Sequence, residues 1–295
     1  MEIFRGSGVA IVTPFNKDGN IDYDSFKRLI DFQIEGGSDA IIVCGTTGES
    51  ATLSYQEHNK LIEECINYVN GRVKVIAGTG SNCTKTAIRL SRDASCMGAD
   101  GLLIVTPYYN KTTQNGLINH YSKIADSVDI PIILYNVPTR TGCDLLPSTV
   151  SSIVKRNENV IGIKEASGNI NRTLEIKELL GDAISVYSGN DDQIVPILSC
   201  GGVGVISVLA NIAPSDTHDM VMKYLNGDVN KSKELQLKSL KLIKSLFSEV
   251  NPIPVKKALE VMGMINGTLR EPLIPMEEEN SKKLIKEMKN YGIKF

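Results

Sequence analysis

Eight short runs rich in β-branched and other apolar residues recur along this 295-residue chain, and helix-like segments separate them. The runs begin at Gly8, Ala40, Val73, Gly101, Pro131, Val160, Ala183 and Gly202. The segments between them, such as 23–37 and 54–71, carry apolar residues at helical spacing, and most end near glycine. This alternation predicts buried parallel strands joined by crossover helices. Eight such units favour an α/β fold of the (β/α)8 TIM barrel type.

The chain is longer than such a barrel requires, because about 250 residues is typical. From about Ala213 onward only helical patterns follow. We expect the first, 215–227, to close the barrel and the remaining three to form a C-terminal helical appendage. The expected division is a barrel with the catalytic site over residues 1–224 and a three-helix region over residues 225–295.

An open doubly wound sheet is the alternative architecture. It is disfavoured because the loops GTTGES (45–50) and GTGSN (78–82) lack the glycine spacings of phosphate-binding loops.

Composition narrows the class of partner. The formal net charge is -2, and no Lys/Arg run with interleaved aromatics occurs, which disfavours nucleic-acid binding. No apolar run approaches the roughly 20 residues that a membrane span needs. The six cysteines form no CxxC pair, and the opening MEIFRGSG does not resemble a signal peptide. We therefore expect a reduced, cytoplasmic protein that acts on small molecules.

In a barrel of this kind the reacting groups lie at the C-terminal ends of the strands and in the loops that follow. These positions are rich in hydroxyl groups and contain no histidine. They are Thr46, Thr47, Glu49, Gly78, Thr79, Thr106, Tyr108, Tyr109, Tyr135, Asn136, Arg140, Lys164, Glu165, Ser188, Gly189, Asn190 and Ser207. The three histidines, His58, His120 and His218, fall in helical patterns, where we expect exposed or core-edge side chains rather than zinc ligands or catalytic bases. The candidate chemistry therefore belongs to lysine, tyrosine, threonine and arginine, without a metal.

Lys164 interrupts the apolar strand VIGIKEASG (160–168). Strand alternation places Val160, Gly162 and Lys164 on one face, and the two isoleucines and Glu165 on the other. The isoleucines would face the helices, and Lys164 would point into the barrel. Burial disfavours the charged form of an amine, which leaves some free amine to attack a carbonyl and form a Schiff base. The alternative is a strand-end lysine paired with a carboxylate.

Three further features could complete such a site. Tyr135 shares a strand face with Ile133, so its phenol can lie near the amine and move protons, or it simply fills the barrel mouth. Loop 45–50 offers two hydroxyls and backbone N–H groups to a carboxylate, or is only a turn before a helix. Arg140 could hold a second carboxylate in its planar fork, or is a solvated loop charge.

The order and spacing of five motifs resemble those of the dihydrodipicolinate synthase family over essentially the whole chain. The motifs are GTTGES (45–50), TPYYN (106–110), YNVPTRTG (135–142), GIKEASG (162–168) and SGND (188–191). The resemblance implies a lyase that condenses pyruvate with L-aspartate 4-semialdehyde through a Schiff base, as a 4-hydroxy-tetrahydrodipicolinate synthase does in lysine and diaminopimelate biosynthesis. It implies no organic cofactor and no catalytic metal.

The resemblance also implies catalytic roles. Lys164 would form the imine with pyruvate, and Tyr135, Thr46 and Tyr109 would form a proton relay. Tyr109 would reach in from a neighbouring subunit, so a complete site needs at least a dimer. We expect a homo-oligomer, a tetramer built from tight dimers.

Substrate-binding residues follow from the same resemblance. Thr47 would hold the pyruvate carboxylate and Arg140 the semialdehyde carboxylate, while the backbone near Gly189 and Ile206 would line the pocket.

Some family members are inhibited by lysine, and this chain departs from their pattern at two positions. Tyr55 stands where regulated bacterial members have histidine, and Thr86 stands where they have glutamate. Loss of that carboxylate removes a direct partner for a lysine ammonium, so we expect weak inhibition or none. The matching positions are Ser50, Ala51, His58, Asn82 and Tyr108.

Two rival functions remain. N-acetylneuraminate lyase shares the barrel, the lysine and the tyrosine, but usually has serine in place of Thr46 and lacks the arginine of PTRTG. A barrel that only binds ligands is opposed by the joint presence of Lys164, Tyr135 and Thr46.

Overall fold

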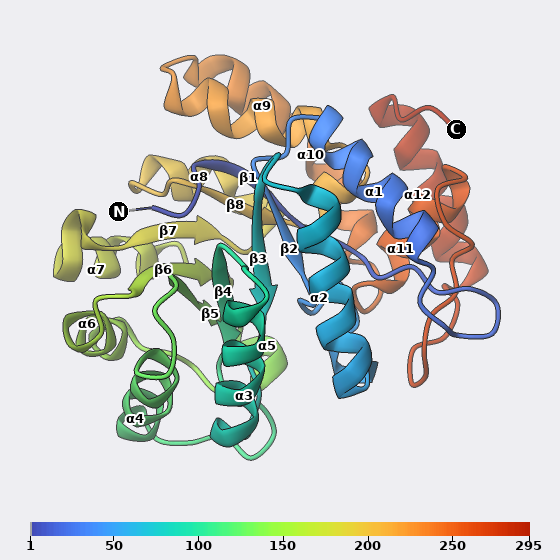
Figure 1. The fold of residues 1–295 in the computed structure, drawn as a ribbon. Helices are drawn as coiled ribbons and strands as arrows, with labels where there is room; N and C mark the ends of the chain where they lie inside the picture. The colour runs from blue at the N-terminus through green and yellow to red at the C-terminus, as the bar shows by residue number, and fades with distance from the viewer. Residues whose placement is uncertain (1) are drawn as a thin grey trace.

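Eight parallel strands form a closed barrel in chain order in the computed structural model, which describes residues 2–295 (Figure 1). Each strand pairs with the next, and β8 returns to pair with β1. The strands are β1 (Gly6–Ala10), β2 (Ala40–Val43), β3 (Lys74–Gly78), β4 (Gly101–Val105), β5 (Ile132–Asn136), β6 (Val160–Glu165), β7 (Ser185–Ser188) and β8 (Gly204–Ser207). The predicted barrel and all eight predicted strands are therefore confirmed.

Helices cover the outside of the barrel between successive strands (Figure 1). They are α1 (Tyr23–Glu35), α2 (Tyr55–Val69), α3 (Thr84–Cys96), α4 (Gln114–Ala125), α6 (Pro147–Arg156), α7 (Asn171–Leu180), α8 (Ile194–Ser199) and α9 (Pro214–Leu225). A short helix, α5 (Pro138–Thr141), follows β5, and 3-10 turns η1 (Ser50–Thr52), η2 (Gly181–Ala183), η3 (Asp191–Gln193) and η4 (Leu209–Asn211) lie in other connections. α9 takes the place predicted for the closing helix.

Helix α2 shows how the sequence sets an element boundary beside the loop 45–50. The Ser54 hydroxyl accepts a hydrogen bond from the Glu57 N–H at 3.2 Å, and the Glu57 carboxylate accepts one from the Ser54 N–H at 2.8 Å. This reciprocal capping box satisfies two N–H groups at the helix start. The chain therefore leaves the loop in a fixed direction.

Buried apolar side chains form two layers because strand residues alternate between the inside and the outside of the barrel. The inner cluster includes Ile42, Ile133 and Tyr187, and the outer cluster, between strands and helices, includes Ile41 and Leu134.

The predicted faces of β6 are wrong at Val160. The register with β5 shifts by one residue, since Ile132 pairs with Val160 whereas Ile133 pairs with Gly162. Val160 consequently lies in the outer cluster with Ile163, not on the face of Lys164. Such an irregularity inserts one residue and reverses the alternation before it.

Three helices follow the barrel, as predicted, and no strand follows β8 within residues 2–295. They are α10 (Val229–Leu246), α11 (Ile253–Val261) and α12 (Glu278–Tyr291). The outer cluster continues into them through Leu246, Leu259 and Met288. The boundary between residues 224 and 225 stays a prediction, because this buried cluster joins both sides of it. No helix in the described chain is long and apolar enough to cross a membrane.

Candidate active site

Lys164 and Tyr135 lie side by side on adjacent strands inside the barrel. They are paired in the register of β5 and β6. The Lys164 Nζ lies 4.4 Å from the centroid of the Tyr135 ring, and the two residues are only 6% and 7% exposed. None of the ion pairs formed within residues 2–295 includes Lys164. The amine is thus buried beside a phenol and is not paired with a carboxylate.

Two adjacent cavities open above this pair. The inner one, about 40 Å³, is lined by Lys164, Tyr135 and Thr46 among others. The outer one, about 490 Å³, is lined by Thr46, Arg140 and Asn251 among others. The two cavities share lining residues, including Thr46 and Gly78, so they lie next to each other.

The loop 45–50 is packed tightly against the neighbouring strands. Gly78 permits this packing, because a Cβ there would lie 2.3 Å from the Cys44 carbonyl oxygen. Thr46 is half-buried and Thr47 is 3% exposed. The Thr47 Oγ1 accepts a hydrogen bond from the Asn251 Nδ2 at 2.9 Å, so the second threonine is held by the chain just before α11.

A buried ion pair fixes the end of this loop. Glu49 adopts the left-handed backbone region, with φ 52°, and its carboxylate lies 2.6 Å from the Lys256 Nζ of α11. The side chains of Glu49 and Lys256 are 1% and 0% exposed. Burial lowers the pKa of Lys256, and the Glu49 carboxylate opposes that shift. The Lys256 ammonium also donates to the Thr13 carbonyl, at 2.9 Å.

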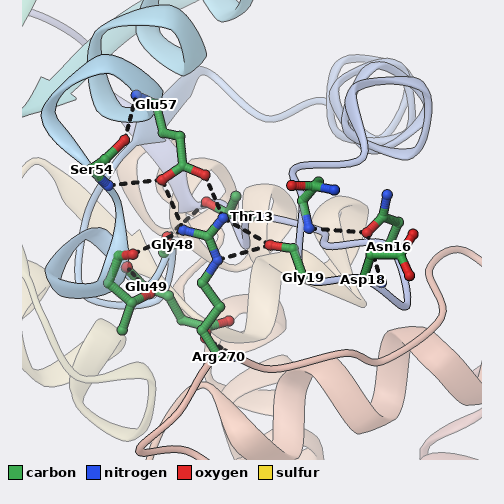
Figure 2. A network of polar contacts seen from close by, with 11 residues as sticks. Thr13, Asn16, Asp18, Gly19, Gly48, Glu49, Ser54, Glu57 and Arg270 are labelled. Atoms are coloured by element: carbon green, nitrogen blue, oxygen red, sulfur yellow. Dashed lines mark hydrogen bonds and ion pairs between the residues drawn. The ribbon is translucent and has the colours of Figure 1, made fainter.

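Arg270 continues this network toward α2 (Figure 2). Its N–H donates to the second Glu49 oxygen at 3.1 Å, and its guanidinium donates to the Glu57 carboxylate and to the carbonyls of Gly19 and Thr52. The Arg270 hydrogen bond holds the pKa of Glu57 at about 2, well below its ordinary value. These residues were not assigned from the sequence, because their contacts join segments more than 200 positions apart.

Arg140 projects from α5 into the outer cavity. Its Nη2 donates to the Asn251 backbone carbonyl at 3.1 Å, which leaves the other guanidinium donors available to a ligand. α5 begins with Pro138 and ends at Gly142, whose φ of 64° suits glycine. This turn places the guanidinium over the barrel mouth.

Gly189 follows β7, and Ile206 lies in β8, which β1 separates from β2. The Gly189 N–H donates to the Glu165 carbonyl at 2.8 Å, and a Cβ at Gly189 would lie 2.5 Å from the Cβ of Ala166. Ile206 is 1% exposed in the inner cluster. Neither of them is among the described residues that line the two cavities.

Asp191, just after β7, is a buried carboxylate that belongs to the motif SGND but received no role from the sequence. It is 2% exposed and accepts hydrogen bonds from the Ser207 hydroxyl at 2.6 Å and from the N–H groups of Val208 and Leu209. Burial raises the pKa of Asp191, which these donors and the nearby Lys164 charge oppose. Its bonds fix the chain that follows β8.

Tyr109 does not meet the other candidate residues within its own chain. It is 90% exposed and has a φ of 68°, whereas its neighbour Tyr108 lines the outer cavity. A bulky aromatic residue with this backbone conformation is uncommon. The loop therefore presents the Tyr109 ring outward.

The histidines lie in helices as predicted, but two are more buried than expected. His58 and His120 are 5% and 4% exposed, and burial lowers the pKa of both, to about 4 for His120. The His58 Nε2 lies 2.9 Å from the Gly78 carbonyl oxygen. His218 pairs with Asp39, whose hydrogen bond raises the His218 pKa. The described residues contain no group of three or more His, Cys, Asp or Glu side chains placed to hold a metal ion.

Five of the seven positions discussed for lysine inhibition line the outer cavity. Thr86 lines it together with Ser50, Ala51, His58 and Tyr108. The Tyr55 ring packs under the guanidinium of Arg89, 3.2 Å from the ring centroid. Weak inhibition by lysine, or none, stays a prediction.

Comparison with known proteins gives a consistent result. Residues 3–291 match the model of the Dihydrodipicolinate synthetase family. A 4-hydroxy-tetrahydrodipicolinate synthase of Lachnoclostridium phytofermentans is 55% identical over 293 residues, which cover 99% of this chain and 100% of that protein.

Two solved structures have the same fold. A dihydrodipicolinate synthase of Acinetobacter baumannii, complexed with pyruvate, has a TM-score of 0.96 and 44% identity, covering 98% of this chain and 99% of that one. A monomeric dihydrodipicolinate synthase variant has a TM-score of 0.97 and 44% identity, covering 99% of this chain and 98% of that one.

Proposed function

This chain belongs to the dihydrodipicolinate synthetase family, and we propose that Lys164 forms the Schiff base through which it acts. Its activity is that of a 4-hydroxy-tetrahydrodipicolinate synthase, a lyase of lysine and diaminopimelate biosynthesis. Enzymes of this family use pyruvate and L-aspartate 4-semialdehyde.

One observation carries the role of Lys164. Its amine is buried beside the Tyr135 ring at the bottom of a small cavity, without a carboxylate partner in the described chain. Imine formation uses the lone pair of the amine, and the position of Lys164 at this cavity lets its amine meet a small carbonyl compound. The pyruvate complex of the Acinetobacter baumannii relative supports pyruvate as the first substrate.

The proposed reaction begins when the Lys164 amine attacks C2 of pyruvate and the carbinolamine loses water to give an imine. Loss of a proton from C3 gives an enamine, whose C3 attacks the aldehyde carbon of the semialdehyde while the aldehyde oxygen gains a proton. The substrate's own amino group then attacks the imine carbon, closes the ring and releases the Lys164 amine. One water leaves per turnover.

The proton transfers are assigned to hydroxyl groups. Tyr135, whose ring lies beside the Lys164 amine, and Thr46 both line the inner cavity. Tyr109 would complete the relay from a partner subunit, which its 90% exposure in a single chain permits. We therefore propose a homo-oligomer, a tetramer of tight dimers, although one structural relative is a monomeric variant.

The two carboxylates are assigned to different donors. Thr47 would bind the carboxylate of pyruvate. Arg140 faces the outer cavity and would bind the carboxylate of the semialdehyde. The backbone near Gly189 and Ile206 would close the remaining side of the pocket. We also propose a reduced, cytoplasmic setting, which the six free cysteines support.

Reductive trapping tests the assignment of Lys164. Borohydride added with pyruvate should fix a pyruvate-derived mass on the peptide that contains Lys164, and the purified protein should turn over pyruvate with L-aspartate 4-semialdehyde. Lys164→Met should remove both signals, whereas Lys155→Met, at an exposed lysine of α6, should keep them. Labelling that persists in Lys164→Met would show that another amine reacts.

A further inference from the structure

One residue outside the barrel contacts both of the side chains proposed to bind substrate carboxylates. Asn251, directly before α11, donates from its side-chain Nδ2 to the Thr47 hydroxyl at 2.9 Å. Its backbone carbonyl accepts a hydrogen bond from the Arg140 Nη2 at 3.1 Å. Asn251 is 7% exposed and borders the outer cavity. The two carboxylate sites are therefore joined through a single C-terminal residue.

We propose that Asn251 is a positioning residue whose side chain prepares Thr47 for pyruvate and whose backbone orients Arg140 for the second substrate. This proposal rests on the proposed function. Asn251 acts through these two residues and is not assigned a contact with the reacting atoms.

The direction of the Asn251 hydrogen bond matters for its effect. A threonine hydroxyl has one hydrogen to donate and two lone pairs that accept. Because the Asn251 amide donates to Thr47, it occupies one lone pair and leaves the hydroxyl hydrogen free. That hydrogen can then be donated to a carboxylate, which accepts hydrogen bonds only. The Asn251 amide thus orients the Thr47 hydroxyl so that it can donate a hydrogen bond to the carboxylate.

Asn251 is itself held in place by the residues that follow it. Lys256, five positions on, is 0% exposed and is bonded to the Glu49 carboxylate and the Thr13 carbonyl. The segment from Asn251 to Lys256 is therefore attached to the loop 45–50 at two points. A residue anchored in this way can hold a hydroxyl in one orientation with little loss of conformational freedom on binding.

This arrangement predicts that side-chain changes at Asn251 affect the two substrates differently. Substitution removes the amide bond to Thr47 but keeps the backbone carbonyl that accepts from Arg140. The KM for pyruvate should rise about threefold to tenfold in Asn251→Ala, the size expected for one neutral hydrogen bond. The KM for the semialdehyde should change by less than twofold, about the limit of such a measurement.

Asn251→Asp provides a second variant of nearly the same shape. Its carboxylate would accept the Thr47 hydrogen and place a negative charge near the pyruvate carboxylate. The pyruvate KM should therefore rise more than in Asn251→Ala. In a Thr47→Val background, Asn251→Ala should have little further effect, because the group it positions is already absent.

The experiment measures both KM values, kcat and thermal unfolding for each variant. Asn159→Ala is the matched control, since it removes a half-buried amide that donates to the Ala125 and Val128 carbonyls in the chain just before β6. It should lower stability but leave both KM values unchanged. Equal rises in both KM values at Asn251, or additive effects with Thr47→Val, would overturn the proposal. Failure of the wild-type protein to turn over the two substrates would instead refute the proposed function.

Discussion

At the scale of single residues, two buried lysines show how surroundings set a role. Lys256 lies 2.6 Å from the Glu49 carboxylate, which favours its charged form and ties α11 to the loop 45–50. Lys164 is nearly as buried but faces the Tyr135 ring instead. The Lys256 ammonium is committed to its buried ion pair, whereas Lys164 lines the inner cavity. This contrast supports Lys164 rather than Lys256 as the nucleophile.

Arg140→Ala tests the specificity assigned to a single guanidinium. A charge-assisted hydrogen bond contributes about 1.5–3 kcal/mol, so kcat/KM for the semialdehyde should fall about tenfold to a hundredfold. Borohydride trapping of pyruvate should be retained, because Arg140 lies in the outer cavity and does not line the inner one. The measurement is kcat/KM for L-aspartate 4-semialdehyde and for N-acetylmannosamine, in the wild-type protein and in Arg140→Ala. Unchanged semialdehyde turnover, or preference for the sugar, would contradict the substrate assignment.

The sequence predicted single residues well where strand alternation governs them. Strand alternation, with its period of two residues, predicted that the Lys164 side chain points into the barrel and that the Tyr135 side chain can lie near it. The same rule failed at Val160, because a register shift is set by pairing with β5 and has no signal in the β6 sequence itself. The burial of His58 likewise depends on how α2 packs against β3, which periodicity alone does not specify.

At the scale of elements, α11 is bonded to the loop that carries the two threonines. Lys256 of α11 bonds to Glu49 and Thr13. Arg270, beyond α11, bonds to Glu49 and Glu57 (Figure 2). The sequence predicted α11 as a helix from its apolar spacing, but not these contacts. Hydrophobic periodicity shows that a face is buried and does not identify the distant segment it meets. The C-terminal region therefore contributes to the site by holding the loop 45–50 in place.

Lys256→Met tests this connection between α11 and the loop. Removing one partner of a buried ion pair leaves an unpaired charge and typically costs about 3–5 kcal/mol, so the free energy of unfolding should fall by that amount. The double variant Glu49→Gln with Lys256→Met should recover part of the loss, because no buried charge remains. Urea unfolding gives the free energy of unfolding of each variant. All variants are measured at one protein concentration, because subunit assembly also contributes to stability.

The neighbouring Lys257 provides the control for this experiment. It forms a partly exposed ion pair with Glu260, one turn away on the same helix. Lys257→Met should therefore change the free energy of unfolding by no more than about 1 kcal/mol. Equal losses at Lys256 and Lys257 would mean that the buried pair is not what holds α11 in place.

At the scale of the whole molecule, one chain supplies most of the proposed site but not all of it. Lys164, Tyr135 and Thr46 meet around the inner cavity, whereas the Tyr109 ring is 90% exposed on a loop with a left-handed backbone. A symmetric dimer can place the same loop of each chain at the site of the other. The sequence could not establish this arrangement, because strand and helix patterns describe a chain and carry no signal for its partner.

Mixing two inactive variants tests whether Tyr109 acts across a subunit interface. Lys164→Met and Tyr109→Phe should each lose most of their activity alone. In a hybrid dimer, the site with an intact Lys164 receives an intact Tyr109 from the Lys164→Met partner, so one site of two is restored. Random assembly from equal amounts makes half of the dimers hybrids, and the mixture should reach about a quarter of wild-type activity. Each variant refolded alone is the control. If Tyr109 instead acts within its own chain, no chain of a hybrid dimer carries both intact residues. The mixture would then be no more active than the average of the two variants, and Tyr109 would not belong to the partner's site.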